Sequence, residues 1–181
     1  MNADQAFRHL RRANEVAVRA AGMGRHPFGA LLVAPDGETV LAEQGNINTV
    51  NHAESTLART AADNWPGAYL AQCTLVTTFE PCAMCAGALV HSRVQRLVFG
   101  ATDLKAGACG SVFDIVRHPQ LNHQLEVCGG VLAEDCARQL SDFFKKRRAE
   151  QKALKLQKNA EQTEMTQPQI SATADTGDAA S

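Results

Sequence analysis

The sequence lacks any apolar stretch near the roughly 18 to 20 residues that a membrane-spanning helix requires. Its first twenty residues also lack the uninterrupted apolar segment of a secretory signal, because four arginines interrupt them: Arg8, Arg11, Arg12 and Arg19. We therefore expect a cytoplasmic protein that is not bound to a membrane. An arginine-rich start leaves an organelle transit peptide as an alternative, although Asp4 and Glu15 disfavour it.

The sequence also lacks a dominant charge, since its formal net charge is −1. Residues 161–181 hold four acids and no Lys or Arg, which leaves 18 basic against 15 acidic residues, a net +3, in residues 1–160. Positive charge is concentrated in one run, at Lys145, Lys146, Arg147, Arg148, Lys152, Lys155 and Lys158. Such a run is usually a solvated helix face, and contact with anions or nucleic acid is the alternative.

Hydrophobic periodicity and turn residues predict a sheet covered by helices. Helices are expected at residues 4–21, from 52 onward, and at 82–91, 112–117 and 134–148; strands are expected at 30–34, 39–43, 74–79, 96–99 and 124–127. The composition beyond about residue 159 is polar and unsuited to a core. We expect one domain over residues 1–150, then a helical extension and a disordered tail over residues 151–181.

Two short patterns carry the chemistry. His52-Ala53-Glu54 begins one expected helix, and Pro81-Cys82-Ala83-Met84-Cys85 follows a strand and begins another. Residues three apart share a helix face, so Cys82 and Cys85 form a chelating pair. Positive potential at a helix N-terminus favours thiolate, the form that binds metal. With His52 they offer zinc three ligands and leave a fourth position open.

Glu54 lies two residues after His52, so we expect it beside the metal without binding it. Zinc lowers the pKa of bound water to roughly 7. A carboxylate there can take the water's proton and pass it to a ring nitrogen and then to a leaving amine. The pattern H-x-E…P-C-x-x-C is the established signature of zinc nucleobase deaminases, so the assignment here is a match to a known motif.

Two other interpretations of the cysteines remain. A C-x-x-C between a strand and a helix also occurs in thioredoxin-like redox proteins, but that interpretation leaves His52 and Glu54 unexplained. A closed structural zinc site would need a fourth ligand, and the candidates are Cys73, Cys109, Cys128 and Cys136. None of these has ligand-like spacing, and each is more typical of a small buried apolar residue. A binding module with structural zinc is the corresponding functional alternative.

These motifs resemble the cytidine-deaminase superfamily, and residues 79–148 resemble the bacterial tRNA-specific adenosine deaminases. The matching stretches are 79–88 (FEPCAMCAGA), 91–93 (HSR), 98–101 (VFGA), 103–107 (DLKAG), 110–111 (GS), 118–119 (HP), 122–123 (NH), 130–132 (GVL) and 141–148 (SDFFKKRR). Residues 26–55 are instead similar to nucleoside and guanine deaminases, in His26-Pro27-Phe28-Gly29 and Asn51-His52-Ala53-Glu54-Ser55.

The resemblance implies a three-layer α/β/α sandwich with a mixed five-stranded sheet, one zinc per subunit and a homodimer. It implies substrate contacts from Phe28, Asn46, the Ala53 N–H and the Glu80 carbonyl. It implies RNA contacts from Lys105, Phe143, Phe144 and Arg147, by base stacking and phosphate pairing. For Phe28, Phe143 and Phe144, core packing is the alternative, and for Asn46 a turn.

The implied reaction is hydrolytic deamination of adenosine to inosine at the wobble position of a tRNA anticodon stem-loop. The alternative substrate is a free nucleobase or nucleoside such as guanine or cytosine, which the resemblance of residues 26–55 favours.

Overall fold

The structure is a computed structural model that describes residues 1–166. Residue contacts separate a compact unit, Met1–Phe143, from a second unit that begins at Phe144. The expected division at residue 150 stays a prediction, and the expected disordered tail at 167–181 lies outside the described residues. Within residues 1–166, no helix is both long and apolar enough to cross a membrane.

The first unit is built on a five-stranded sheet with the strand order β2-β1-β3-β4-β5. The strands are β1 (Gly29–Val33), β2 (Val40–Gly45), β3 (Thr74–Phe79), β4 (Arg96–Ala101) and β5 (Glu126–Cys128). Strand β1 is antiparallel to both β2 and β3, whereas β3, β4 and β5 run parallel. The mixed five-stranded sheet is therefore confirmed.

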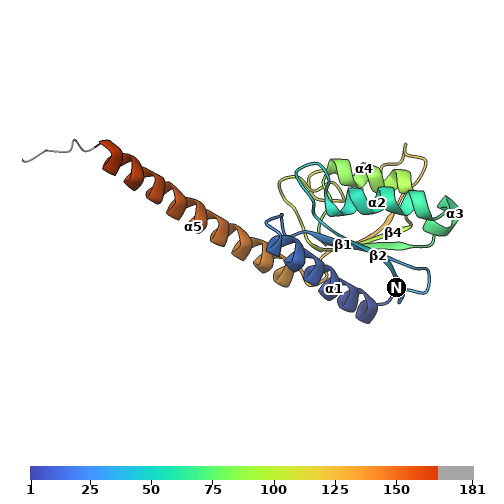
Figure 1. The fold of residues 1–181 in the computed structure, drawn as a ribbon. Coiled ribbons are helices and arrows are strands. Elements are labelled where there is room, and N and C mark those ends of the chain that lie inside the picture. Colours follow the sequence, from blue (N-terminus) through green and yellow to red (C-terminus); the bar gives the residue numbers. More distant parts are fainter. Residues whose placement is uncertain (167–181) are drawn as a thin grey trace, which may run out of the picture. The chain divides into compact units, whose positions relative to one another are not determined.

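Helices cover both faces of this sheet (Figure 1). Helix α1 (Ala3–Gly22) lies on one face, and α2 (Ala53–Asn64) and α4 (Ala83–Ser92) pack side by side on the other. Alternate residues of β1 belong to the two separate cores: Ala30 and Leu32 pack under α2 and α4, and Leu31 and Val33 pack under α1. Burial on both faces explains why β1 is apolar without interruption, and the three-layer sandwich is confirmed.

Close approach of α1 to the sheet depends on a glycine. A Cβ atom at Gly29 would lie 2.7 Å from the backbone nitrogen of Ala17 and 2.9 Å from the Cβ of Val16. Asn2 caps α1 and forms a reciprocal capping box with Gln5. Gly29 therefore places the start of β1 directly against a rigid helix.

Two elements differ from the sequence-based expectations. The helix expected at residues 112–117 is absent and the expectation was wrong: this segment is a loop in which the backbone N–H groups of Val112 and Phe113 both donate to the Gly107 carbonyl. A short helix, α3 (Gly67–Leu70), follows the break after α2. Helix α5 (Ala133–Thr166) runs from the helix expected at residues 134–148 into the segment where a helical extension was expected.

Candidate metal centre

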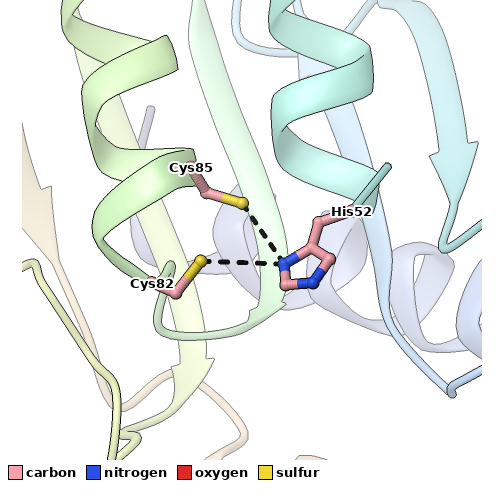
Figure 2. A group of neighbouring side chains, drawn as sticks. All are labelled: His52, Cys82 and Cys85. Carbon is pink, nitrogen blue, oxygen red and sulfur yellow. Dashed lines mark hydrogen bonds between the residues drawn. The ribbon is translucent and has the colours of Figure 1, made fainter. Parts of the chain in front are cut away.

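Two helix N-termini bring together the residues that the two motifs singled out. His52 is the N-cap residue of α2, and Cys82 is the N-cap residue of α4, with Cys85 in the first turn of α4. Because α2 and α4 pack against each other, their N-terminal ends meet beyond the end of β3. Figure 2 shows the imidazole of His52 facing both cysteine sulfurs.

The distances among these three side chains fit a tetrahedral metal. His52 Nδ1 lies 3.7 Å from Cys82 Sγ and 3.6 Å from Cys85 Sγ, and all three ligand atoms lie within 4.8 Å of one another. Zinc bonds of about 2.1 Å to nitrogen and 2.3 Å to sulfur, at tetrahedral angles, separate such donor atoms by about 3.6 Å. The donor set and its spacing therefore suit zinc.

The His52 ring is held by its second nitrogen. His52 Nε2 lies 3.1 Å from the carbonyl oxygen of Thr49, which can only accept a hydrogen bond. The proton is therefore assigned to Nε2, which leaves the lone pair of Nδ1 directed at the two sulfurs. This backbone contact fixes both the tautomer and the orientation that a metal ligand requires.

A hydrogen bond between the two thiols favours the thiolate form of Cys82. Donation from Cys85, with the nearby His52, lowers the pKa of Cys82 to about 5. The same contact and burial raise the pKa of Cys85. A dication that binds both sulfurs displaces the remaining proton, since thiolate is the ligating form.

Within the described part of the chain, the set of clustered ligand atoms contains no fourth protein residue. The other cysteines, Cys73, Cys109, Cys128 and Cys136, are free thiols outside this set. Burial raises the pKa of Cys73 to about 11 and also raises that of Cys109, so both stay protonated. This arrangement disfavours the closed structural site and leaves the fourth metal position open.

The carboxyl group of Glu54 lies beside the metal ligands. Its side chain is buried, and its Oε2 atom lies 3.6 Å from Cys85 Sγ, although Glu54 is not one of the three clustered ligands. Burial raises the pKa of Glu54, and a hydrogen bond from Thr77 partly opposes that rise. A buried carboxyl group with a raised pKa, next to a metal site, is suited to accept and return a proton.

Thr77 is a site residue that the sequence-based reasoning missed. Its hydroxyl donates to Glu54 Oε1 at 2.7 Å, and its oxygen also lies 3.2 Å from the Gly29 carbonyl oxygen. Both Thr77 and Glu54 are buried. The sequence contained one sign of this role, a hydroxyl group in the middle of an apolar strand. A buried polar group needs a hydrogen-bond partner, so such a hydroxyl points to a contact with another residue. Thr77 holds Oε1, which leaves Oε2 facing the cysteines.

We expect Thr77→Val to lower kcat about tenfold, because it removes one hydrogen bond to the carboxylate without changing side-chain volume. The zinc content and KM should stay unchanged. Thr77→Ser retains the hydroxyl and should recover most of the activity. Thr74→Val, which makes the same chemical change at the start of β3, is the matched control. Equal kcat values for the Thr77→Val and Thr74→Val variants would show that Thr77 has no special effect on Glu54.

The side chain of Glu80 holds a loop in place, which is separate from the substrate contact expected of the Glu80 backbone carbonyl. Its carboxylate accepts backbone hydrogen bonds from Asp103, Cys109 and Ser111, at 3.0 to 3.1 Å. These bonds hold the 103–111 loop, which reaches the metal centre through a backbone bridge between Cys82 and Gly107. Lys105 is exposed on this loop. The substrate contact of the Glu80 carbonyl stays a prediction.

Phe28 and Asn46 lie together, because the backbone N–H of Asn46 donates to the Phe28 carbonyl. The Asn46 side chain is buried; its Nδ2 donates to the Asn48 carbonyl, while its Oδ1 has no hydrogen-bond partner among residues 1–166. A buried acceptor without a partner indicates a missing ligand or water. The Phe28 ring packs edge-on against Phe79, with centroids 5.7 Å apart.

The other residues from which substrate or RNA contacts were expected lie in different units. Ala53 is fully buried directly after His52, and Phe143 packs edge-on against His26, with ring centroids 6.3 Å apart. Phe144 and Arg147 belong to the second unit, so their expected RNA contacts stay predictions.

Known proteins share this fold and this motif. Residues 2–101 match the family model of the cytidine and deoxycytidylate deaminase zinc-binding region. Over 148 residues, the chain is 47% identical to the tRNA-specific adenosine deaminase of Haemophilus influenzae, covering 79% of this chain and 85% of that protein. It is also similar to two solved structures.

The first of these comes from a study of A-to-I editing by tRNA:A34 deaminases at the wobble position of transfer RNA. It has a TM-score of 0.65 and 31% identity, and the match covers 74% of this chain and 99% of that chain. The second is the guanine deaminase of Nitrosomonas europaea, with a TM-score of 0.56, 25% identity and coverage of 75% of this chain and 82% of that chain.

The chain therefore belongs to the cytidine and deoxycytidylate deaminase family. It is a zinc-dependent hydrolytic deaminase, and the expected superfamily, fold and cofactor are confirmed.

Proposed function

We propose that this enzyme converts adenosine to inosine at the wobble position of a tRNA anticodon, in the cytoplasm. The observation that carries the proposed chemistry is the group of His52, Cys82 and Cys85 with the buried carboxyl of Glu54 beside it. The choice of substrate is supported by the 47% identity to the tRNA-specific adenosine deaminase of Haemophilus influenzae.

His52, Cys82 and Cys85 would hold the zinc, which supplies Lewis acidity and an activated water when bound. Glu54 accepts one proton from the attacking water and delivers it to the neighbouring ring nitrogen. It then takes the second proton from the hydroxyl group added to the ring carbon and delivers it to the leaving amine. Water is consumed, the exocyclic amine leaves as ammonia, and the base gains a carbonyl. Thr77 keeps Glu54 Oε1 fixed throughout. Burial of Glu54 keeps its pKa high enough for the carboxyl to return the proton.

The base would be held by four groups near the metal centre. The unpartnered Oδ1 of Asn46 accepts a hydrogen bond from an N–H group of the base, and Phe28 forms a wall of the pocket. The Ala53 N–H and the Glu80 carbonyl orient the reacting edge. Because Asn46 Oδ1 is already buried, leaving it without a partner is costly, which favours a ligand that supplies a donor.

The RNA would contact residues around this pocket and on α5. A flipped base stacks on Phe143 or Phe144, and Lys105 and Arg147 pair with phosphates.

We also propose a homodimer. Exposed apolar side chains lie on the segments that carry the metal ligands and on the loop bridged to Cys82, a distribution that supports a protein contact there. These side chains are Ile47, Val50, Met84, Leu104, Val112 and Phe113.

The alternative substrate is a free base such as guanine or cytosine. It is favoured by the His26-Pro27-Phe28 sequence beside Asn46 and by the 25% identity to the guanine deaminase of Nitrosomonas europaea. The chemistry of Glu54 and the metal is the same for both substrates, so only turnover distinguishes them.

The experiment compares substrates with one zinc-loaded preparation. An anticodon stem-loop with adenosine at the wobble position, free guanine and free cytosine are supplied separately, and ammonia release and inosine formation are measured. We expect turnover of the stem-loop with a kcat/KM at least about a hundredfold above that of either free base. A stem-loop with adenosine moved to the next anticodon position is the control. Turnover of the free bases alone would overturn the proposed substrate.

A further inference from the structure

The 103–111 loop is wound around one buried carboxylate. Glu80 is 3% exposed, and its Oε1 atom accepts the backbone N–H groups of Cys109, at 3.0 Å, and Ser111, at 3.1 Å. Its Oε2 atom accepts the N–H of Asp103 at 3.1 Å. Burial of a carboxylate is costly unless hydrogen bonds replace its water shell, and three donors from the loop do so here. One side chain therefore joins both ends of the loop.

The same loop lies against the segment that carries a metal ligand. The Ala108 N–H donates to the Pro81 carbonyl at 2.8 Å, and a backbone bridge joins Gly107 to Cys82. Cys82 is the N-cap residue at the start of α4 (Figure 2), but its side chain makes no capping hydrogen bond. The position of its sulfur therefore depends on the surrounding backbone, and the loop holds part of that backbone.

The loop is packed tightly on its inner side and loosely behind. A Cβ atom at Gly107 would lie 2.5 Å from Glu80 Cδ and 2.5 Å from the Asp103 carbonyl oxygen. Behind the loop, a cavity of about 260 Å³ lies between it and strands β4 and β5, and its lining includes Glu80, Cys109 and Ser111. The loop therefore has room to shift, and its hydrogen bonds to Glu80, rather than close packing, oppose that shift.

We propose that Glu80 is a positioning residue for the metal ligand Cys82. Its carboxylate fixes the 103–111 loop, the loop fixes the backbone of Pro81 and Cys82, and that backbone fixes the direction of the sulfur. Replacing a group that orients a metal ligand from outside the ligand set lowers metal affinity roughly ten- to a hundredfold. Glu80 acts through the backbone, so we expect the lower end of that range. The inference depends on the zinc centre and not on the proposed tRNA substrate.

Glu80→Gln should weaken zinc binding to the full chain by about tenfold. The amide keeps one acceptor oxygen, which can still bind the N–H groups of Cys109 and Ser111. Its NH2 group then faces the Asp103 N–H and cannot accept a hydrogen bond from it. Zinc affinity is measured by competition with a chromogenic chelator, using zinc alone as the ligand. Amide hydrogen exchange on the same protein should be faster at Asp103 and less affected at Cys109 and Ser111.

A second variant disturbs the same contact from the side of the loop. Gly107→Ala places a methyl group against the Glu80 carboxyl group, so the loop must shift and zinc binding should weaken as it does in Glu80→Gln. Gly87→Ala makes the same chemical change in α4, where nothing lies within 4 Å of the added atom. Glu126→Gln removes an exposed carboxylate from β5. Both of these controls should keep the zinc affinity of the unaltered chain.

Thermal unfolding of the same proteins separates positioning from general stability. Weaker zinc binding in Glu80→Gln and Gly107→Ala, with both controls unchanged, is the expected result. Unchanged zinc affinity in either folded variant, even with lower thermal stability, would overturn the inference, because Glu80 would then serve only the fold. An equal loss of zinc affinity in Gly87→Ala or Glu126→Gln would overturn it as well. If Glu80→Gln does not fold, Gly107→Ala decides by the same comparison.

Failure of this inference differs from failure of the proposed function. The zinc measurements contain no nucleic acid, so a wrong substrate assignment would leave their outcome unchanged. If the unaltered chain deaminates the stem-loop but both variants of the Glu80 contact bind zinc normally, only the positioning role is wrong. If zinc affinity falls as expected but no adenosine is converted, the proposed substrate is wrong and the positioning role stands.

Discussion

Replacement of Glu54 by alanine is expected to lower kcat by about a thousandfold or more, while the enzyme keeps its zinc. The carboxyl group is buried, lies 3.6 Å from Cys85 Sγ and is not part of the ligand set. Proton transfer by a positioned group contributes about a hundredfold to ten-thousandfold to a rate. Deamination kinetics and metal analysis on the same preparation provide the measurement.

Two further variants show whether the loss of activity is due specifically to the Glu54 carboxylate. Glu54→Gln keeps the shape and the contact to Thr77 but cannot accept the water's proton, so it should be as inactive as Glu54→Ala. Glu15→Ala removes an exposed glutamate from α1 and should behave like the unaltered enzyme. More than a tenth of the activity remaining in both Glu54 variants would contradict the role of Glu54, and no change at all would favour a binding module with structural zinc.

Replacement of Cys82 by alanine is expected to abolish both zinc binding and turnover. Cys82 supplies one of three ligands, and the hydrogen bond from Cys85 lowers its pKa to about 5, which favours the thiolate that binds metal. Two remaining ligands hold zinc far more weakly than three. Zinc content after dialysis, and activity before and after zinc is added back, provide the measurement.

A matched control separates metal loss from general damage. Cys128→Ala removes an exposed thiol outside the ligand set and should leave zinc content and kcat unchanged. A chelator should inactivate the unaltered enzyme and the Cys128→Ala variant, and added zinc should restore both but not the Cys82→Ala variant. Full zinc occupancy in the Cys82→Ala variant would contradict the assigned ligand set.

Most of the secondary structure was predictable, because burial imposes a period on the sequence. The strand expected at residues 74–79 coincides with β3, and the continuous apolar run of β1 reflects burial on both faces. The helix expected at 112–117 failed because that segment's backbone bonds to Gly107 and Ala108 instead, in a loop that the distant Glu80 carboxylate holds. Local periodicity contains no information about such a partner.

Some residues of the candidate site were likewise predictable from the sequence, and others were not. The metal ligands were predictable because each belongs to a short motif at a helix N-terminus, where neighbours in sequence remain neighbours in space. Thr77 was not predictable, because its contact with Glu54 joins residues 23 positions apart. The loop-holding role of the Glu80 side chain depends on the same kind of long-range contact, which only the folded chain creates.

Zinc-edge X-ray absorption on the purified full chain tests the central claim most directly, since it counts the atoms bound to the metal. We predict one zinc per subunit with two sulfur neighbours at about 2.3 Å and one histidine nitrogen at about 2.0 to 2.1 Å. The Cys82→Ala variant should lose this signal. A third sulfur, or a second histidine nitrogen, would mean that a protein atom closes the fourth position and would contradict the account.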